Sequence, residues 1–123
     1  AVSVTNPFSM IAFEAAYRGG ADWLSELMTY LQATRDEAVA FIRAHIPKIN
    51  VVCPEGTYLL WLDCRKLNLD DKALALFFVQ EAQLGLSSGA MFGRGGKGFM
   101  RMNIGTPRAN VMKALNRLKS ALS

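Results

Sequence analysis

The run Gly98-Phe99-Met100-Arg101-Met102-Asn103-Ile104 has side chains that alternate in a way that predicts a strand with two unlike faces. Successive side chains of a strand point to opposite faces of the sheet. The two methionines and the isoleucine therefore form an apolar face that we expect in the core. Phe99, Arg101 and Asn103 share the other face, where a guanidinium lies between an aromatic ring and an amide.

Arg101 is the candidate binding residue on that second face. A guanidinium held in a partly apolar setting needs an anion, and its planar fork of N–H donors suits a carboxylate. Spacing alone leaves two interpretations open. Arg101 either pairs with an Asp or Glu of its own domain, which is the more common role of arginine, or binds an anionic ligand.

The composition predicts one globular domain over residues 1–123. Hydrophobic residues make up 51% of the chain and charged residues 20%, and 123 residues suffice for a single core. The net charge is only +4, and no basic stripe alternates with aromatic residues, so we expect no nucleic-acid partner. No apolar run is long enough to span a membrane and no targeting segment is visible, so we expect no membrane partner.

The two cysteines are predicted to stay reduced. Cys53 and Cys64 lie near the outer ends of two adjacent strand-like runs. If these runs pair across residues 54–56, Cys53 faces a residue near Tyr58 and lies well away from Cys64. A disulfide is therefore not expected, and a reducing cytoplasm fits. Together with the single histidine, His45, the cysteines form no pattern typical of a metal site.

The predicted order of elements is helix, helix, strand, strand, helix, short strand, strand, helix. Helices are expected from Pro7, from about residue 22 to 45, from 71 to about 83, and from Pro107, and strands at 49–53, 57–63, 86–88 and 98–104. Asn6, Asp70 and Thr106 are the predicted helix caps. This order predicts an α+β fold, with helices packed on one face of a small, mostly antiparallel sheet.

The glycine-rich segment at residues 93–98 formally matches the dinucleotide-binding pattern G-x-G-x-x-G. That pattern requires a helix after the loop, because the helix N-terminus holds the phosphates, whereas a strand is predicted here. A Walker-type loop also fails, since Lys97 is followed by Gly98. A mobile surface loop is one interpretation of this segment, and a functional role for it stays open. No paired carboxylates or Ser–His arrangement supports a hydrolytic site either.

Four segments together resemble the C-terminal part of pyridoxal-phosphate enzymes of the aminotransferase superfamily, fold type I. They are PEGTYLLWLDCR at 54–65, SGAMFG at 88–93, GFMRMNI at 98–104 and the opening TNPFS at 5–9. The group they resemble most is that of the cystathionine β-lyase-like C–S lyases. The resemblance covers nearly the whole chain and implies the small-domain fold of aminotransferases.

The resemblance also implies roles for individual residues. The arginine that matches Arg101 holds the α-carboxylate of the amino-acid substrate in that family, and no catalytic residue is expected in this segment. Gly89 and Asn103 are expected near the active site. Thr5 and Asn6 match a segment that lies near the neighbouring subunit's active site in these homodimers. Ser88 departs from the pattern, because many members have proline before the glycine.

The segment that attaches the cofactor has no counterpart here. Family members hold pyridoxal phosphate through a lysine of a large domain, and no lysine of this chain lies in a similar context. The resemblance therefore implies the C-terminal small domain of a larger enzyme whose large domain is absent. We expect the chain alone to bind no cofactor and to be inactive.

Two functional questions stay open at this point. In the complete enzyme the cofactor would make the substrate's α-proton acidic, but these residues do not decide between a C–S β-lyase and an aminotransferase. The alternatives from other classes are a regulatory relative that binds a ligand without turnover and a free-standing interaction module.

Overall fold

The computed structural model describes residues 6–123, and the chain divides into two compact units, Ala1–Gln32 and Ala33–Ser123. Thr5, one of the predicted site residues, lies outside the described residues. The long helix α2, Ala21–His45, contributes residues to both units. In the part of the chain that the structure describes, no helix combines the length and the apolar character needed to cross a membrane.

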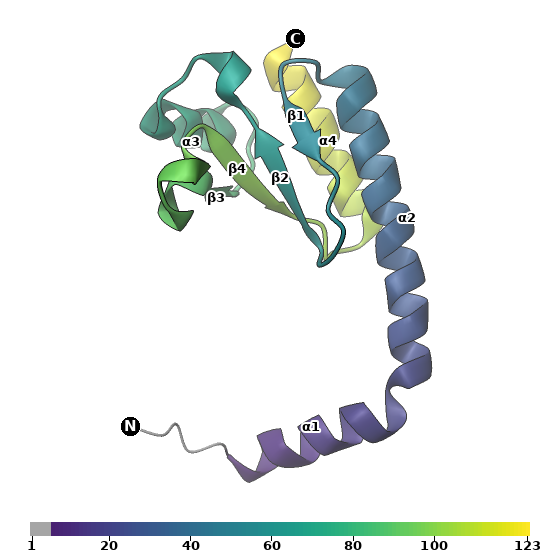
Figure 1. The fold of residues 1–123 in the computed structure, drawn as a ribbon. Coiled ribbons are helices and arrows are strands. Elements are labelled where there is room, and N and C mark those ends of the chain that lie inside the picture. Colours follow the sequence, from purple (N-terminus) through teal and green to yellow (C-terminus); the bar gives the residue numbers. More distant parts are fainter. Residues whose placement is uncertain (1–5) are drawn as a thin grey trace. The chain divides into compact units, whose positions relative to one another are not determined.

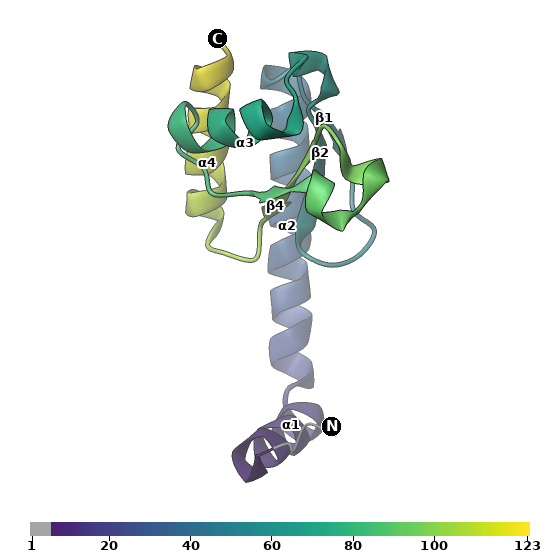
Figure 2. The ribbon, with the colours of Figure 1, turned by 90° about the vertical axis from the view of Figure 1, so that its left-hand side faces the viewer.

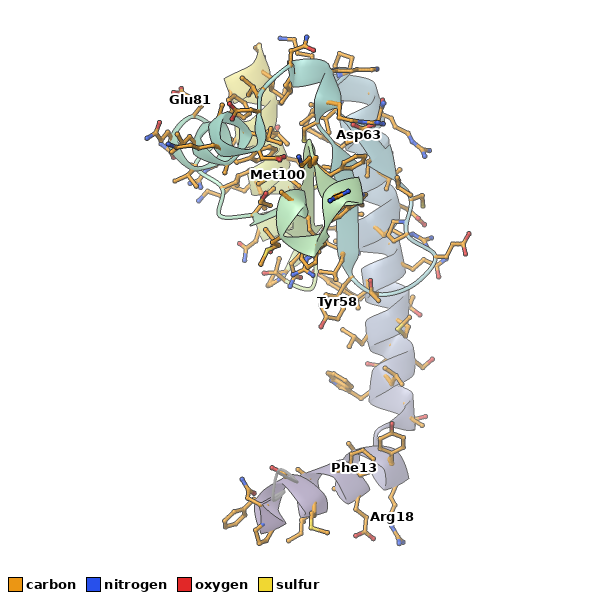
Figure 3. The ribbon with its side chains drawn as sticks, turned by 60° about the vertical axis from the view of Figure 1, so that its left-hand side comes forward. Phe13, Arg18, Tyr58, Asp63, Glu81 and Met100 are labelled. Atoms are coloured by element: carbon orange, nitrogen blue, oxygen red, sulfur yellow. The ribbon has the colours of Figure 1, made fainter. Side chains whose placement is uncertain are left out.

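The first unit consists of α1, Pro7–Gly19, and the first part of α2. The predicted start of α1 is confirmed: Asn6 is the N-cap, and its side-chain oxygen accepts a hydrogen bond from the Ser9 amide at 2.9 Å. None of the residues of α1 is buried. Figure 3 labels Phe13 and Arg18 on this helix, and both side chains project outward from it.

The second unit is built on a four-stranded sheet in which every neighbouring pair is antiparallel. Its strand order is β1-β2-β4-β3, and the strands are β1 Asn50–Val52, β2 Leu59–Asp63, β3 Ser87–Ser88 and β4 Phe99–Asn103. The other helices are α3 Asp71–Gln80 and α4 Arg108–Leu122 (Figure 1). Short 3-10 turns follow β2 (η1, Arg65–Leu67) and β3 (η2, Gly89–Phe92, and η3, Arg94–Gly96).

One face of this sheet forms the core. The register places Leu60 opposite Met102 and Leu62 opposite Met100, and none of the four is more than 3% exposed. The helices supply the facing apolar side chains, among them Ile42 of α2, Phe78 of α3 and Leu115 of α4. Figure 1 shows α4 beside the C-terminal part of α2, and Figure 2 shows η2 and η3 on the opposite side of the sheet from α2. The predicted α+β fold, with helices on one face, is confirmed.

The end of α3 differs from the prediction. Asp70 caps its start as expected, with the side chain accepting from the Ala73 amide at 2.8 Å, but the helix ends at Gln80 rather than near residue 83. Gln83 adopts a left-handed conformation with φ of 54°, and the Leu84 amide donates to the Phe78 carbonyl at 2.7 Å. This turn buries Leu84, so packing ends the helix before the glycine at position 85.

The predicted cap of the last helix is wrong by one residue. Pro107 is the N-cap of α4, and its carbonyl accepts from the Asn110 amide at 2.8 Å. Thr106 lies outside the helix, and its Oγ1 accepts a hydrogen bond from the side chain of Asn110 at 3.3 Å. Proline has no amide to donate but can still offer its carbonyl, so it fits this position.

The hairpin between β1 and β2 is looser than predicted. Val52 lies opposite Trp61, so residues 53–58 connect the strands rather than residues 54–56 alone. Pro54 has no N–H for the ladder, and Thr57 has a φ of 64°, so the pairing cannot extend further. Cys53 therefore lies in the connection and is exposed, whereas Cys64 is buried; both are free thiols.

Candidate functional site

The sheet face without helices brings together residues from three strands. Arg101 of β4 lies opposite Trp61 of β2 on one side and Ser87 of β3 on the other. Residues directly opposite each other in antiparallel strands share a face of the sheet. The predicted separation of Arg101 from the core is confirmed, because its neighbours Met100 and Met102 are buried on the other face.

Arg101 has an aromatic and a hydroxyl neighbour. Its guanidinium carbon lies 4.5 Å from the centroid of the Phe92 ring, and its Nη2 donates to Ser87 Oγ at 3.4 Å. Among residues 6–123, no carboxylate forms an ion pair with it. The half-buried guanidinium therefore keeps both its charge and most of its N–H donors for another group, and the interpretation of Arg101 as one half of an internal ion pair is not supported.

Two aromatic rings continue from Phe92 across this face. Trp61 lies edge-on to Phe92 with centroids 5.9 Å apart, and it stacks on Phe99 at 5.5 Å. The guanidinium of Arg65 lies 5.0 Å from the Phe99 centroid. We call Phe92, Trp61 and Phe99 the aromatic ladder. The ladder has an arginine at each end.

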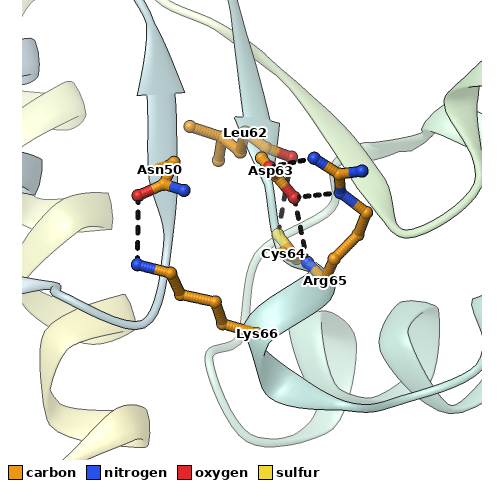
Figure 4. A network of polar contacts seen from close by, with 6 residues as sticks. All are labelled: Asn50, Leu62, Asp63, Cys64, Arg65 and Lys66. Carbon is orange, nitrogen blue, oxygen red and sulfur yellow. Dashed lines mark hydrogen bonds and ion pairs between the residues drawn. The ribbon is translucent and has the colours of Figure 1, made fainter.

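The second arginine, Arg65, is paired. Its Nε and Nη2 donate to the two oxygens of Asp63 at 2.9 and 2.7 Å, and its backbone amide donates at 3.1 Å (Figure 4). The side-chain hydrogen bonds from Arg65 lower the pKa of Asp63, and the same hydrogen bonds to Asp63 raise the pKa of Arg65. Asp63 is thus satisfied within its own turn.

The glycine-rich segment is folded against the sheet. Gly89 is buried at the start of η2, and a Cβ there would lie only 2.7 Å from the carbonyl oxygen of Phe99. At the other end, the Gly98 amide donates to the Asp71 side chain at 2.9 Å, and its carbonyl accepts from the Cys64 amide at 2.9 Å. The absence of a side chain at Gly89 allows η2 to approach β4 and bring Phe92 to Arg101.

The other predicted site residues lie in different settings. Asn103 is exposed on the face that carries Arg101, and its Oδ1 accepts from the Gly105 amide at 2.7 Å. Asn6 belongs to the first unit, where it caps α1. No group of three or more His, Cys, Asp or Glu side chains arranged to hold a metal ion occurs within residues 6–123.

Sequence reasoning missed three neighbours of Arg101, namely Trp61, Ser87 and Phe92. The alternation of the second strand indicates which residues share a face with Trp61, but the register that sets it opposite Arg101 is not readable from the chain. Phe92 reaches the site through η2, and no local pattern predicts that contact.

The chain is similar to cystathionine β-lyase PatB of Bacillus subtilis strain 168. The two are 40% identical over 118 residues, which are 96% of this chain and 30% of the relative. The chain therefore spans about a third of the length of the curated relatives that it matches. A scan against models of known protein families found no match.

Solved structures give the same result. A pyridoxal-phosphate-bound protein of Clostridium difficile 630, provisionally assigned as an aminotransferase, superposes with a TM-score of 0.94 at 40% identity. The superposed region makes up 99% of this chain and 32% of the Clostridium difficile chain. Cystalysin of Treponema denticola, which contains a pyridoxal 5′-phosphate cofactor, gives 0.91 at 32% identity and covers 95% and 30%. The resemblance predicted from the sequence is confirmed, as is the aminotransferase small-domain fold.

Proposed function

We infer that this chain, which is homologous to the C-terminal part of cystathionine β-lyases, supplies the carboxylate-binding arginine of a larger enzyme that acts on amino acids. The observation that carries the proposal is the guanidinium of Arg101, which has no carboxylate partner among residues 6–123. A half-buried cation without a counter-ion is a ready site for an anionic ligand.

Arg101 performs a binding and orienting role in this proposal. Its planar donors would hold the substrate's α-carboxylate by two parallel hydrogen bonds. The strand β4 would fix the direction of approach, because it is an inner strand that pairs with β2 on one side and β3 on the other. Pyridoxal phosphate, when bound in the complete enzyme, supplies the electron sink that makes the α-proton acidic.

The residues present fit the substrate side of such a site rather than attachment of the cofactor. Every lysine of the chain is exposed on the surface: Lys48, Lys66, Lys72, Lys97, Lys113 and Lys119. We therefore assign the cofactor-bearing lysine to the part of the enzyme outside this chain, and we propose that the chain alone is inactive.

The similarity favours a C–S β-lyase over an aminotransferase, because curated relatives that are 40% and 37% identical to this chain carry lyase names. A β-lyase would expel a thiol from the substrate's β-carbon, whereas an aminotransferase would keep that bond and move the amino group. No residue of the Arg101 site distinguishes these outcomes, since both reactions begin from a bound α-carboxylate.

The large domain and a second subunit are the proposed partners. Large apolar side chains of the first unit are exposed, and such surfaces mark interaction sites. They include Phe8, Ile11, Phe13, Tyr17 and Trp23, each at least 65% exposed. We assign this surface to contacts within the complete enzyme, a homodimer. The two free thiols favour a reducing compartment such as the cytoplasm.

The test compares two ligands in the full-length enzyme. Wild type, Arg101→Ala and Arg101→Lys are each measured with the amino-acid substrate and with an analogue whose carboxylate is an uncharged amide. Loss of a charged, bidentate contact should lower kcat/KM for the carboxylate by roughly tenfold to a hundredfold and leave the amide little changed. Equal discrimination by wild type and Arg101→Ala would overturn the proposal.

A further inference from the structure

The two arginines at the ends of the aromatic ladder have different partners. Arg65 has a bidentate carboxylate, whereas the hydrogen bond that Arg101 makes within residues 6–123 is a single contact to Ser87 Oγ at 3.4 Å. That contact is too long to fix a flexible side chain. The face of the Phe92 ring is therefore the principal group that holds the Arg101 guanidinium.

An aromatic ring is suited to hold this guanidinium without consuming it. A carboxylate would neutralise the charge and occupy the N–H donors, as Asp63 does for Arg65. A ring face attracts the cation through its quadrupole and leaves the donors in the guanidinium plane for a ligand. Stacking also reduces the rotamer freedom that Arg101 would lose on binding.

Phe92 is itself supported from the sheet. Its ring lies edge-on to Trp61, and Trp61 stacks on Phe99, so the orientation of Phe92 is tied to side chains of β2 and β4. These contacts hold a ring that is 50% exposed on a short turn. Support of this kind distinguishes Phe92 from Met91 beside it, which is 72% exposed.

We propose that Phe92 is the positioning residue that orients Arg101 for its ligand. This inference rests on the proposed role of Arg101. Phe92 acts through the guanidinium and not on the reacting atoms. Its aromatic ring, rather than its bulk, carries the function, so tyrosine should replace it and leucine should not.

The first measurement is the NMR spectrum of the 123-residue chain. Protons of Arg101 that lie over the Phe92 ring are shifted upfield by the ring current. Phe92→Leu should move these resonances to the values of an unstacked arginine, whereas Phe92→Tyr should keep them. Met91→Leu is the matched control on the same turn and should leave them unchanged.

The second measurement uses the full-length enzyme and the carboxylate–amide comparison. Phe92→Leu should reduce the preference for the carboxylate substrate by roughly threefold to tenfold, mainly through KM, and Phe92→Tyr should restore it. Thermal unfolding of each variant confirms that the comparison is made between folded proteins.

The outcomes separate this inference from the proposed function. If Arg101→Ala loses the preference and Phe92→Leu keeps it, Arg101 binds the carboxylate and Phe92 is not its positioning residue. If Arg101→Ala itself keeps the preference, the proposed function fails and the positioning role fails with it. Loss of the NMR shift without any change in preference also overturns the inference.

Discussion

Arg65 and Asp63 form a bidentate pair within one turn, with Nε and Nη2 lying 2.9 and 2.7 Å from the two carboxylate oxygens. Asp63 is the last residue of β2 and lies opposite Phe99, which shares a face of the sheet with Arg101. The pair therefore satisfies the acidic side chain at this edge of the face, and its contribution can be measured by titration.

Asp63→Asn should destabilise the chain at neutral pH. The pKa of Asp63 is lowered in the folded state, so its contribution is present above the unfolded pKa of about 3.9 and is lost as the pH falls through the folded pKa. Because Arg65 is 67% exposed, solvent screening should limit the effect to about 0.5–1 kcal/mol. Denaturant unfolding across this pH range checks it: a difference between wild type and variant that persists in strong acid contradicts the assignment.

Asp70→Ala should cost about 1 kcal/mol, because the Asp70 side chain caps α3 through the Ala73 amide. Thr106→Ala is the matched control, since Thr106 makes no side-chain hydrogen bond to a backbone amide of α4. Its effect should stay within about 0.5 kcal/mol. Chemical denaturation midpoints give both values, and a larger loss for Thr106→Ala would mean that α4 begins one residue earlier.

Gly89→Ala should destabilise the second unit by roughly 1–3 kcal/mol, the range for forced overpacking. The added Cβ would lie 2.7 Å from the Phe99 carbonyl oxygen and 2.9 Å from the Phe99 Cβ, and closer still to the carbonyl oxygen of Gly96. Gly95→Ala provides the control, because nothing lies within 4 Å of a Cβ at that position. Thermal unfolding should separate the two variants, and equal midpoints would show that η2 can move away from β4.

Cys53 should react with a thiol reagent in the native chain while Cys64 stays protected. Cys53 is exposed, whereas burial raises the pKa of Cys64 to about 12 and suppresses its thiolate. Mass spectrometry after brief alkylation should find one modified site, and a second in denaturant. Rapid modification of Cys64 under native conditions would indicate that the end of β2 opens.

The chain should not take up pyridoxal phosphate at one lysine. All of its lysines are exposed on the surface. Incubation with the cofactor, reduction with borohydride and peptide mapping should find sparse labelling spread over several lysines. Stoichiometric labelling of a single lysine would contradict the assignment of the cofactor-bearing residue to another part of the enzyme.

Features that depend on residues close together in the chain can be predicted from the sequence alone. Asn6 and Asp70 cap their helices because each side chain reaches an amide three residues ahead. The alternation around Arg101 assigns its face, because a strand has a period of two whatever it pairs with. The resemblance to C–S lyases added the role proposed for Arg101.

Features that depend on which segments meet are set by tertiary packing. Burial of Leu84 ends α3 early, and the register of the paired strands sets Trp61 and Ser87 opposite Arg101. Close packing at Gly89 brings Phe92 over the guanidinium. Strand pairing and core packing join residues far apart in the chain, and local spacing carries no information about which of them will touch.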